Sequence, residues 1–151
     1  MENDVWITVF AKPSKTKSSQ KLLVVNDISL EDLIVKISSA LSYLKSDIVG
    51  CFIYGSRARK TNKSSSDVDL IIFFKQLTNS EELKDIKNDL VKKIGIPIDF
   101  VACIYTKKWI EHTDDRDICY FEQIKPDAIQ IMGTHDLSYL IETSKKLGKI
   151  L

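Results

Sequence analysis

Three short, largely apolar segments most restrict what this chain can fold into. They lie at residues 48–54, 67–74 and 97–105 and are rich in β-branched and aromatic side chains. Each is shorter than an ordinary core helix, and nearly continuous apolar runs of this length are typical of buried strands. We therefore expect an α/β (α+β) fold in which these segments form a central sheet.

Two amphipathic helices are expected beside these strands. Residues 30–44 carry leucine and isoleucine at helical spacing, and Ser29 followed by Asp32 resembles a helix-capping box. Residues 80–93 form a second, more charged amphipathic segment. The order along the centre of the chain is thus helix, strand, strand, helix, strand.

The two ends of the chain add further elements. Residues 5–10 and 21–25 are β-prone and flank a Lys- and Ser-rich segment, which predicts a hairpin with a basic loop. Toward the C-terminus, residues 107–112 are expected to form a helical turn, residues 128–132 a short strand and residues 137–147 a closing helix.

The length of 151 residues fits one domain. We expect it to comprise a hairpin over 1–27, a core over 30–104, and a closing strand and helix over 128–147. The 22 Lys and Arg nearly balance the 21 Asp and Glu, so there is no overall electrostatic attraction to nucleic acid or to a membrane surface.

Cysteine usage and the absence of apolar targeting segments indicate the compartment. Cys51, Cys103 and Cys119 are odd in number and far apart, which suits free thiols in a reducing environment. The chain starts with polar residues instead of a signal peptide, and no segment is long and apolar enough to span a bilayer. We expect a cytoplasmic protein with no membrane association.

Three aspartates are the candidate chemical groups. Asp67 and Asp69 are two residues apart at the start of a predicted strand, so their carboxylates point to the same side. Asp99 lies in another apolar strand, where a carboxylate has to be paired, protonated or metal-bound. If the two strands are neighbours, a site of three hard oxygen ligands suited to Mg²⁺ results. Taken alone, the Asp-x-Asp pair is equally compatible with solvated strand-edge aspartates.

Gly55 and Ser56 follow the first buried strand. Backbone amides and the serine hydroxyl at such a turn can hold phosphate oxygens, and glycine leaves the room for a close approach. The alternative is a plain strand-to-helix turn in which Ser56 is the N-cap.

These residues together resemble a known family. Gly55-Ser56, ten intervening residues, Asp67-Val68-Asp69 and the later Asp99 are similar to the signature of the DNA polymerase beta nucleotidyltransferase superfamily. The stretch GSRARKTNKSSSDVDLIIF most resembles its minimal nucleotidyltransferase branch, and the resemblance extends from the first to the third predicted strand.

The resemblance implies a mixed central sheet flanked by helices, with the N-terminal hairpin as an extension. It implies an enzyme that transfers a nucleoside monophosphate, such as AMP from ATP, to an acceptor hydroxyl. Asp67, Asp69 and Asp99 would be the catalytic residues and would hold two Mg²⁺ ions.

The resemblance also assigns the nucleotide contacts. Gly55, Ser56, Arg57 and Arg59 would bind the triphosphate, with Arg59 the preferred arginine, although arginines beside a turn are as often simply solvated. One residue departs from the pattern, because Lys60 stands where the minimal branch usually has glycine. The geometry of the turn after Arg59 is the feature that this departure puts in question.

Three functions compete at this point. The first is transfer of AMP to a partner protein, such as a toxin of the HEPN class. The second is nucleotide addition to a nucleic-acid 3′ end held by the basic loop, which is less favoured because Lys-rich loops are commonly only solvated. The third is a non-catalytic partner-binding module, against which the intact Asp67, Asp69 and Asp99 argue. The aromatic pair Tyr120-Phe121 is either core packing or part of a partner surface.

Overall fold

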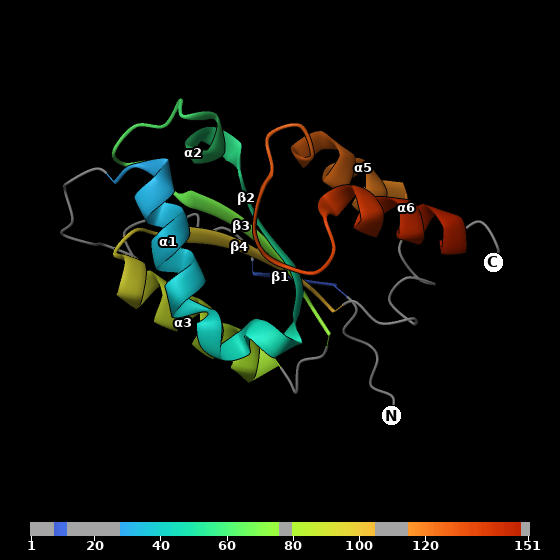
Figure 1. The fold of residues 1–151 in the computed structure, drawn as a ribbon, viewed down its shortest axis with the longest axis horizontal. Coiled ribbons are helices and arrows are strands. Elements are labelled where there is room, and N and C mark those ends of the chain that lie inside the picture. The colour runs from blue at the N-terminus through green and yellow to red at the C-terminus, as the bar shows by residue number, and fades with distance from the viewer. Residues whose placement is uncertain (1–7, 12–27, 76–79, 105–114, 149–151) are drawn as a thin grey trace.

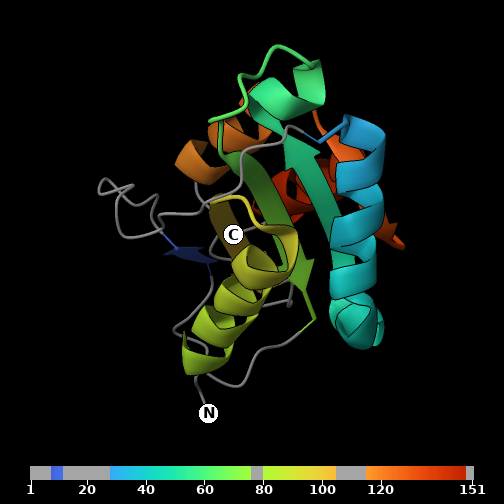
Figure 2. The same ribbon diagram turned by 90° about the vertical axis from the view of Figure 1, so that its left-hand side faces the viewer.

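A five-stranded mixed sheet lies between two layers of helices in the computed structural model, which describes residues 8–11, 28–75, 80–104 and 115–148 (Figures 1 and 2). The strand order is β1-β4-β3-β2-β5. Strands β3 and β4 are parallel, and the other neighbours are antiparallel. The strands are β1 Thr8–Ala11, β2 Ile48–Tyr54, β3 Val68–Phe74, β4 Ile98–Ile104 and β5 Ile129–Gly133. The predicted mixed sheet with flanking helices is confirmed.

The helices divide between the two faces of this sheet. Helices α1 and α3 cover one face, α5 and α6 cover the other, and the short α2 lies at the end of β2 (Figure 1). Their bounds are α1 Leu30–Ala40, α2 Gly55–Arg59, α3 Ser80–Ile94, α5 Asp115–Ile124 and α6 Leu137–Gly148, with a 3₁₀ helix, η2, at Ser42–Asp47. In the described ranges, no helix has the length and apolar character needed to cross a bilayer.

Helix α1 begins where the capping signal predicts and ends earlier than expected. The hydroxyl of Ser29 accepts a hydrogen bond from the amide of Asp32 at 3.1 Å. The helix stops at Ala40, and the rest of the predicted segment is the 3₁₀ helix. There the hydroxyl of Ser42 donates to the carbonyl of Ser39 at 2.9 Å, and side-chain bonds of this kind compete with the helical pattern. Leu44 is buried in spite of this change.

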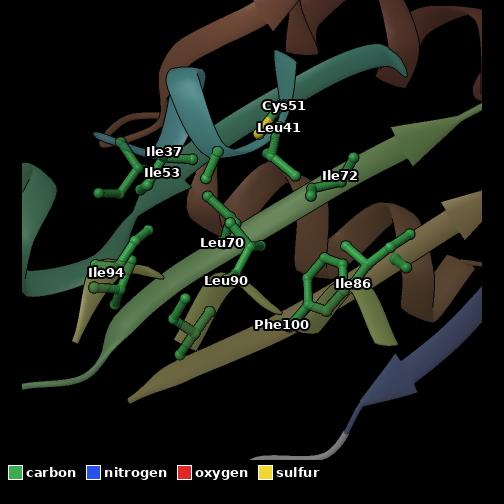
Figure 3. Packing of buried hydrophobic residues seen from close by; sticks show 14 of the residues in the cluster. Ile37, Leu41, Cys51, Ile53, Leu70, Ile72, Ile86, Leu90, Ile94 and Phe100 are labelled. Carbon is green, nitrogen blue, oxygen red and sulfur yellow. The ribbon is translucent and has the colours of Figure 1, made fainter. Parts of the chain in front are cut away.

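The two faces of the sheet carry separate hydrophobic clusters. Alternate residues of each strand point to opposite sides, so Leu70 and Ile72 pack under α1 and α3, as Figure 3 shows, while Ile71 and Phe73 pack under α5 and α6. In β2 a register shift between Ile48 and Gly50 changes this alternation.

The N-terminal strand pairs with β4, where Phe10 lies opposite Val101. Residues 21–25, which were to form the second strand of the predicted hairpin, lie outside the described residues, as does the helical turn predicted at 107–112. The hairpin therefore stays a prediction. Helix α5 was not predicted from the sequence.

Candidate active site

Three ionisable side chains form a row across the central strands. Tyr54 of β2 lies opposite Asp69 of β3, and Asp69 lies opposite Asp99 of β4. Directly opposed residues on neighbouring strands project from the same face of a sheet. Asp69 and Asp99 lie two residues before Ile71 and Val101, which belong to the cluster under α5 and α6, so the row lies on that face. The two aspartate-bearing strands are therefore neighbours, which was the condition for a joint carboxylate site.

The carboxylates influence one another electrostatically. Burial, followed by the negative charge and hydrogen bonding of Asp99 and by the charge of Asp67, raises the pKa of Asp69 to about 6. Asp67 directly precedes β3, and its Oδ1 atom is buried. Asp69 and Asp99 are thus hydrogen-bonding partners, and Asp67 is close enough to act on the charge of Asp69.

Gly55 makes room for Asp69. Its φ of 78° lies in the left-handed region, and a Cβ atom at this position would lie 2.1 Å from Oδ2 of Asp69. A side chain at residue 55 would therefore displace the carboxylate. We expected this glycine to admit a phosphate, and the structure adds that the space beside it is already used to seat a strand carboxylate.

Ser56 lies in the first turn of α2 and is not its cap. The N-cap position belongs to Tyr54, which excludes the alternative that Ser56 is the capping residue. The carbonyl of Ser56 accepts a hydrogen bond from the amide of Thr61 at 2.9 Å, which folds the following segment back over the helix.

The two motif arginines have different surroundings. Arg57 is buried, with 2% of its surface exposed, and its guanidinium donates to the carbonyl oxygens of Ser64 and Ser66. Arg59 has a half-exposed side chain and forms an ion pair with Asp127 at 3.0 Å. Its charge also lowers the pKa of Asp69, which the carboxylates raise. Arg59 is thus accessible from solvent, and its charge acts on Asp69.

Lys60 keeps the turn geometry that its sequence departure put in question. It has φ 63° and ψ 31°, the left-handed conformation that glycine adopts most easily, and its amide donates to the carbonyl of Arg57 at 3.2 Å. Its ammonium group pairs with Glu31 at 3.1 Å, and both side chains are well exposed. The turn is therefore preserved, with a lysine in a conformation that costs it energy.

Helix α5 adds a residue that the motif did not reveal. The hydroxyl groups of Tyr54 and Tyr120 hydrogen-bond to each other, and their rings meet edge to face with centroids 6.3 Å apart. Burial is the main cause that raises the pKa of both phenols, and the charges of Asp69 and Asp99 act in the same direction. The neighbouring Phe121 is buried in the core. The sequence signal was the apolar spacing of residues 121 and 124, which is too short to be decisive.

The donor chemistry suits a hard divalent cation. Asp69 and Asp99 offer adjacent carboxylate oxygens, the ligands that Mg²⁺ prefers, and Asp67 can supply a third. In the described part of the chain, no three acidic, imidazole or thiol groups already converge as a metal cluster. Coordination of one ion by all three carboxylates therefore requires their side chains to move closer together.

Comparison with known proteins confirms the resemblance found in the motif. A family model described as polymerase beta, nucleotidyltransferase, matches residues 35–119. A search of curated proteins found no match.

Solved structures share the fold. A toxin–antitoxin structure with AMP-PNP has a TM-score of 0.57 at 14% identity and covers 78% of this chain and 87% of its own. The complex of the tri-AMPylated Shewanella oneidensis HEPN toxin with its MNT antitoxin has a TM-score of 0.53 at 13% identity, covering 80% and 88%. A minimal nucleotidyltransferase has a TM-score of 0.52 at 24% identity, covering 70% and 98%.

Proposed function

Because the chain belongs to the polymerase beta nucleotidyltransferase family, we propose that it transfers AMP from ATP to an acceptor hydroxyl with the help of Mg²⁺. One observation carries the proposal. Asp69 and Asp99 face each other across the parallel strands β3 and β4, next to the Gly55 turn that seats Asp69. A half-buried pair of repelling carboxylates is costly to the metal-free protein, and a bound cation offsets that cost.

The three carboxylates are the proposed Mg²⁺ ligands. Asp67, Asp69 and Asp99 would hold two Mg²⁺ ions, in keeping with their oxygen donors and their mutual influence on protonation. When bound, the ions supply positive charge that stabilises the negative charge developing at the α-phosphate.

The turn after β2 is the proposed binding site for the triphosphate. Ser56 and the backbone at Gly55 lie at the end of the strand that flanks Asp69. Arg59 would add positive charge to the phosphates, because its guanidinium is half exposed and already acts on Asp69. Arg57 belongs to the same motif, but its guanidinium hydrogen-bonds to loop carbonyls, so the phosphate contact is given to Arg59.

The proposed transfer occurs in one step, without a covalent enzyme intermediate. The acceptor oxygen attacks the α-phosphorus, a new oxygen–phosphorus bond forms, and the bond from the α-phosphorus to the bridging oxygen breaks, so that pyrophosphate leaves. The proton of the acceptor passes to the carboxylate of Asp99 or to water. Asp99 is suited to this role because it stands in a half-buried position beside a second carboxylate.

A hydroxyl on a partner protein is the favoured acceptor. Among proteins with the same fold, one is an MNT antitoxin in complex with a tri-AMPylated HEPN toxin. We propose a HEPN-type toxin as the partner of this chain as well. A nucleic-acid 3′ end is the alternative acceptor. The basic loop of this chain that would hold it lies outside the described residues, and salt-dependent RNA binding would be the observation that favours this acceptor.

The proposal is tested by calorimetric titration of ATP and the other nucleoside triphosphates in the presence and absence of Mg²⁺. The wild type is expected to bind ATP with Mg²⁺, and an Asp67→Asn, Asp69→Asn double variant is expected to lose at least about 100-fold in affinity, because charged ligand oxygens are replaced by amides. Transfer to a candidate partner is then followed with ATP labelled at the α-phosphate.

Asp85→Asn is the matched control, since Asp85 is exposed on α3 and its substitution removes a carboxylate charge from the opposite side of the sheet. It should bind nucleotide as the wild type does. A wild type that binds no nucleotide would favour the non-catalytic partner-binding module instead.

A further inference from the structure

A charged side chain is buried in α2, the short helix next to the candidate metal site. Among the residues whose burial is described, Arg57 is the only charged or polar one that is buried. Its Nε donates to the carbonyl of Ser66 at 3.1 Å, and its Nη2 donates to Ser66 at 3.0 Å and to Ser64 at 3.3 Å. Burying a guanidinium is unfavourable unless it is well hydrogen-bonded, so these bonds are a condition for its place in the fold.

The segment that Arg57 holds leads directly into Asp67. The amide of Lys63 donates to the hydroxyl of Ser66 at 2.9 Å, and the amide of Ser66 donates back to the carbonyl of Lys63 at 3.0 Å. Val68, on the other side of Asp67, donates its amide to the carbonyl of Pro97 at 2.9 Å. Asp67 is thus fixed between a loop end tied to Arg57 and the start of the β3–β4 ladder.

The same arginine is joined to the seat of Asp69. Arg57 is part of α2, which begins at Gly55, and Gly55 packs directly against the carboxylate of Asp69. One five-residue helix therefore touches Asp69 at its first residue and, through Arg57, holds the backbone just before Asp67. Such outer contacts orient metal ligands and tune the affinity of the site.

We propose that Arg57 is a positioning residue that sets the divalent-cation affinity of the Asp67, Asp69 and Asp99 site through the place of Asp67, without contacting the nucleotide. This inference rests on the proposed function. It also predicts that the shape of the guanidinium matters more than its charge, because two of its nitrogens donate to Ser66 together and a lysine ammonium cannot reproduce that fork.

The test is a titration of the full chain with Mn²⁺, alone and with ATP, followed by electron paramagnetic resonance of the free ion. Arg57→Lys keeps the charge, and Arg57→Gln keeps a hydrogen-bond donor without it. Both variants are expected to bind Mn²⁺ about 10- to 100-fold more weakly than the wild type, the range typical for lost outer contacts of metal ligands.

Leu90→Ala is the matched stability control, because Leu90 is buried under the opposite face of the sheet. It should lower the unfolding midpoint and leave the Mn²⁺ dissociation constant within about twofold. If Arg57→Lys behaves like Leu90→Ala, Arg57 is only structural and the inference is overturned. If Arg57→Lys keeps wild-type affinity and Arg57→Gln loses it, the charge acts directly, which also overturns the inference.

Ser66→Ala keeps the test open should the arginine variants not fold. It removes the hydroxyl that accepts from Lys63 without touching the core, so a fewfold loss of Mn²⁺ affinity in a folded protein is expected. Unchanged affinity would count against the positioning role. A wild type that binds no Mn²⁺ would overturn the proposed function itself, whereas a wild type that binds it leaves only the role of Arg57 to be decided by the variants.

Discussion

The two faces of the central sheet are built from the same strands and differ in what stands at one end. Under α1 and α3, inward residues such as Leu70 and Phe100 are apolar and fully buried. Under α5 and α6, β2 ends in Tyr54, and β3 and β4 carry Asp69 and Asp99 at their second positions. A shift of one residue along a strand therefore separates a face that only stabilises from a face that carries ionisable groups.

Substitutions on the two faces of the sheet should therefore affect stability and ligand binding separately. Substitutions under α1 and α3 should lower the free energy of unfolding and spare the site. Substitutions at the ionisable end of the other face should alter binding, and some of them should raise stability, because the carboxylates repel one another in the metal-free protein.

The largest expected effect on stability comes from truncating a buried side chain under α1 and α3. Leu70→Ala should lower the free energy of unfolding by about 3 kcal/mol, since Leu70 is fully buried, and leave the affinity for Mg²⁺ and ATP within about twofold. Ile71→Ala, equally buried but facing α5, should lose similar stability and also weaken nucleotide binding. Urea unfolding and calorimetry measure both. Loss of binding in a folded Leu70→Ala protein would break the separation.

A clash on the site face comes next. Gly55→Ala should cost about 2 to 3 kcal/mol of stability, because the added Cβ meets the Asp69 carboxylate and residue 55 has a positive φ. In an Asp69→Ala background the same change should cost about 1 kcal/mol less, since the carboxylate is gone. Equal costs in both backgrounds, measured by urea unfolding, would show that the contact with Asp69 is unimportant.

Removing one carboxylate should have the opposite sign. The folded protein holds the pKa of Asp69 at about 6, above its ordinary 3.8, so the native state binds this proton more tightly and stability falls as pH rises through 6. Asp69→Asn should thus raise the free energy of unfolding near pH 7.5, without metal, by about 1 to 2 kcal/mol.

The gain should disappear below about pH 4, where Asp69 is protonated in both states. Unfolding curves with a chelator present follow this profile. Added Mg²⁺ should stabilise the wild type and not the variant. A gain that is independent of pH would mean that charge repulsion is not its cause.

The smallest effect concerns the turn beside the site. Lys60→Gly should stabilise the protein by about 1 kcal/mol, because Lys60 adopts the left-handed conformation, and its exposed ion pair with Glu31 contributes little. Lys60→Ala, which loses the same ion pair and keeps the strained conformation, is the comparison variant. If both unfold at the same urea concentration, the conformation of residue 60 carries no cost.

Much of the fold could be predicted because its signals are local. The three apolar segments became β2, β3 and β4, and the cap at Ser29 set the start of α1. The predicted end of α1 was wrong, since the hydroxyl of Ser42 donates to the carbonyl of Ser39 and the segment after Ala40 becomes a 3₁₀ helix. Helix α5 was missed because its buried residues, such as Phe121 and Ile124, are few and lie among charged ones.

The site was predictable in composition and not in its contacts. Spacing placed Asp67 and Asp69 on one side of a strand, but only the order of strands in space brings Asp99 opposite Asp69. The hydroxyl pair of Tyr54 and Tyr120 joins residues 66 positions apart, and no local pattern encodes it. The different surroundings of Arg57 and Arg59 depend on how the loop between them and Asp67 folds back.

The parallel register of β3 and β4 also bears on how this chain can change in length. Val68 stands opposite Ile98 and Asp69 opposite Asp99, and the amide of Val68 is already bonded to the carbonyl of Pro97 just before β4. Adding or deleting one residue in the connection at Gly95 would slide β4 by one position and turn Asp99 toward the opposite side of the sheet. That connection is consequently a place where insertions and deletions should be rare, although it lies far along the chain from the glycine-serine motif.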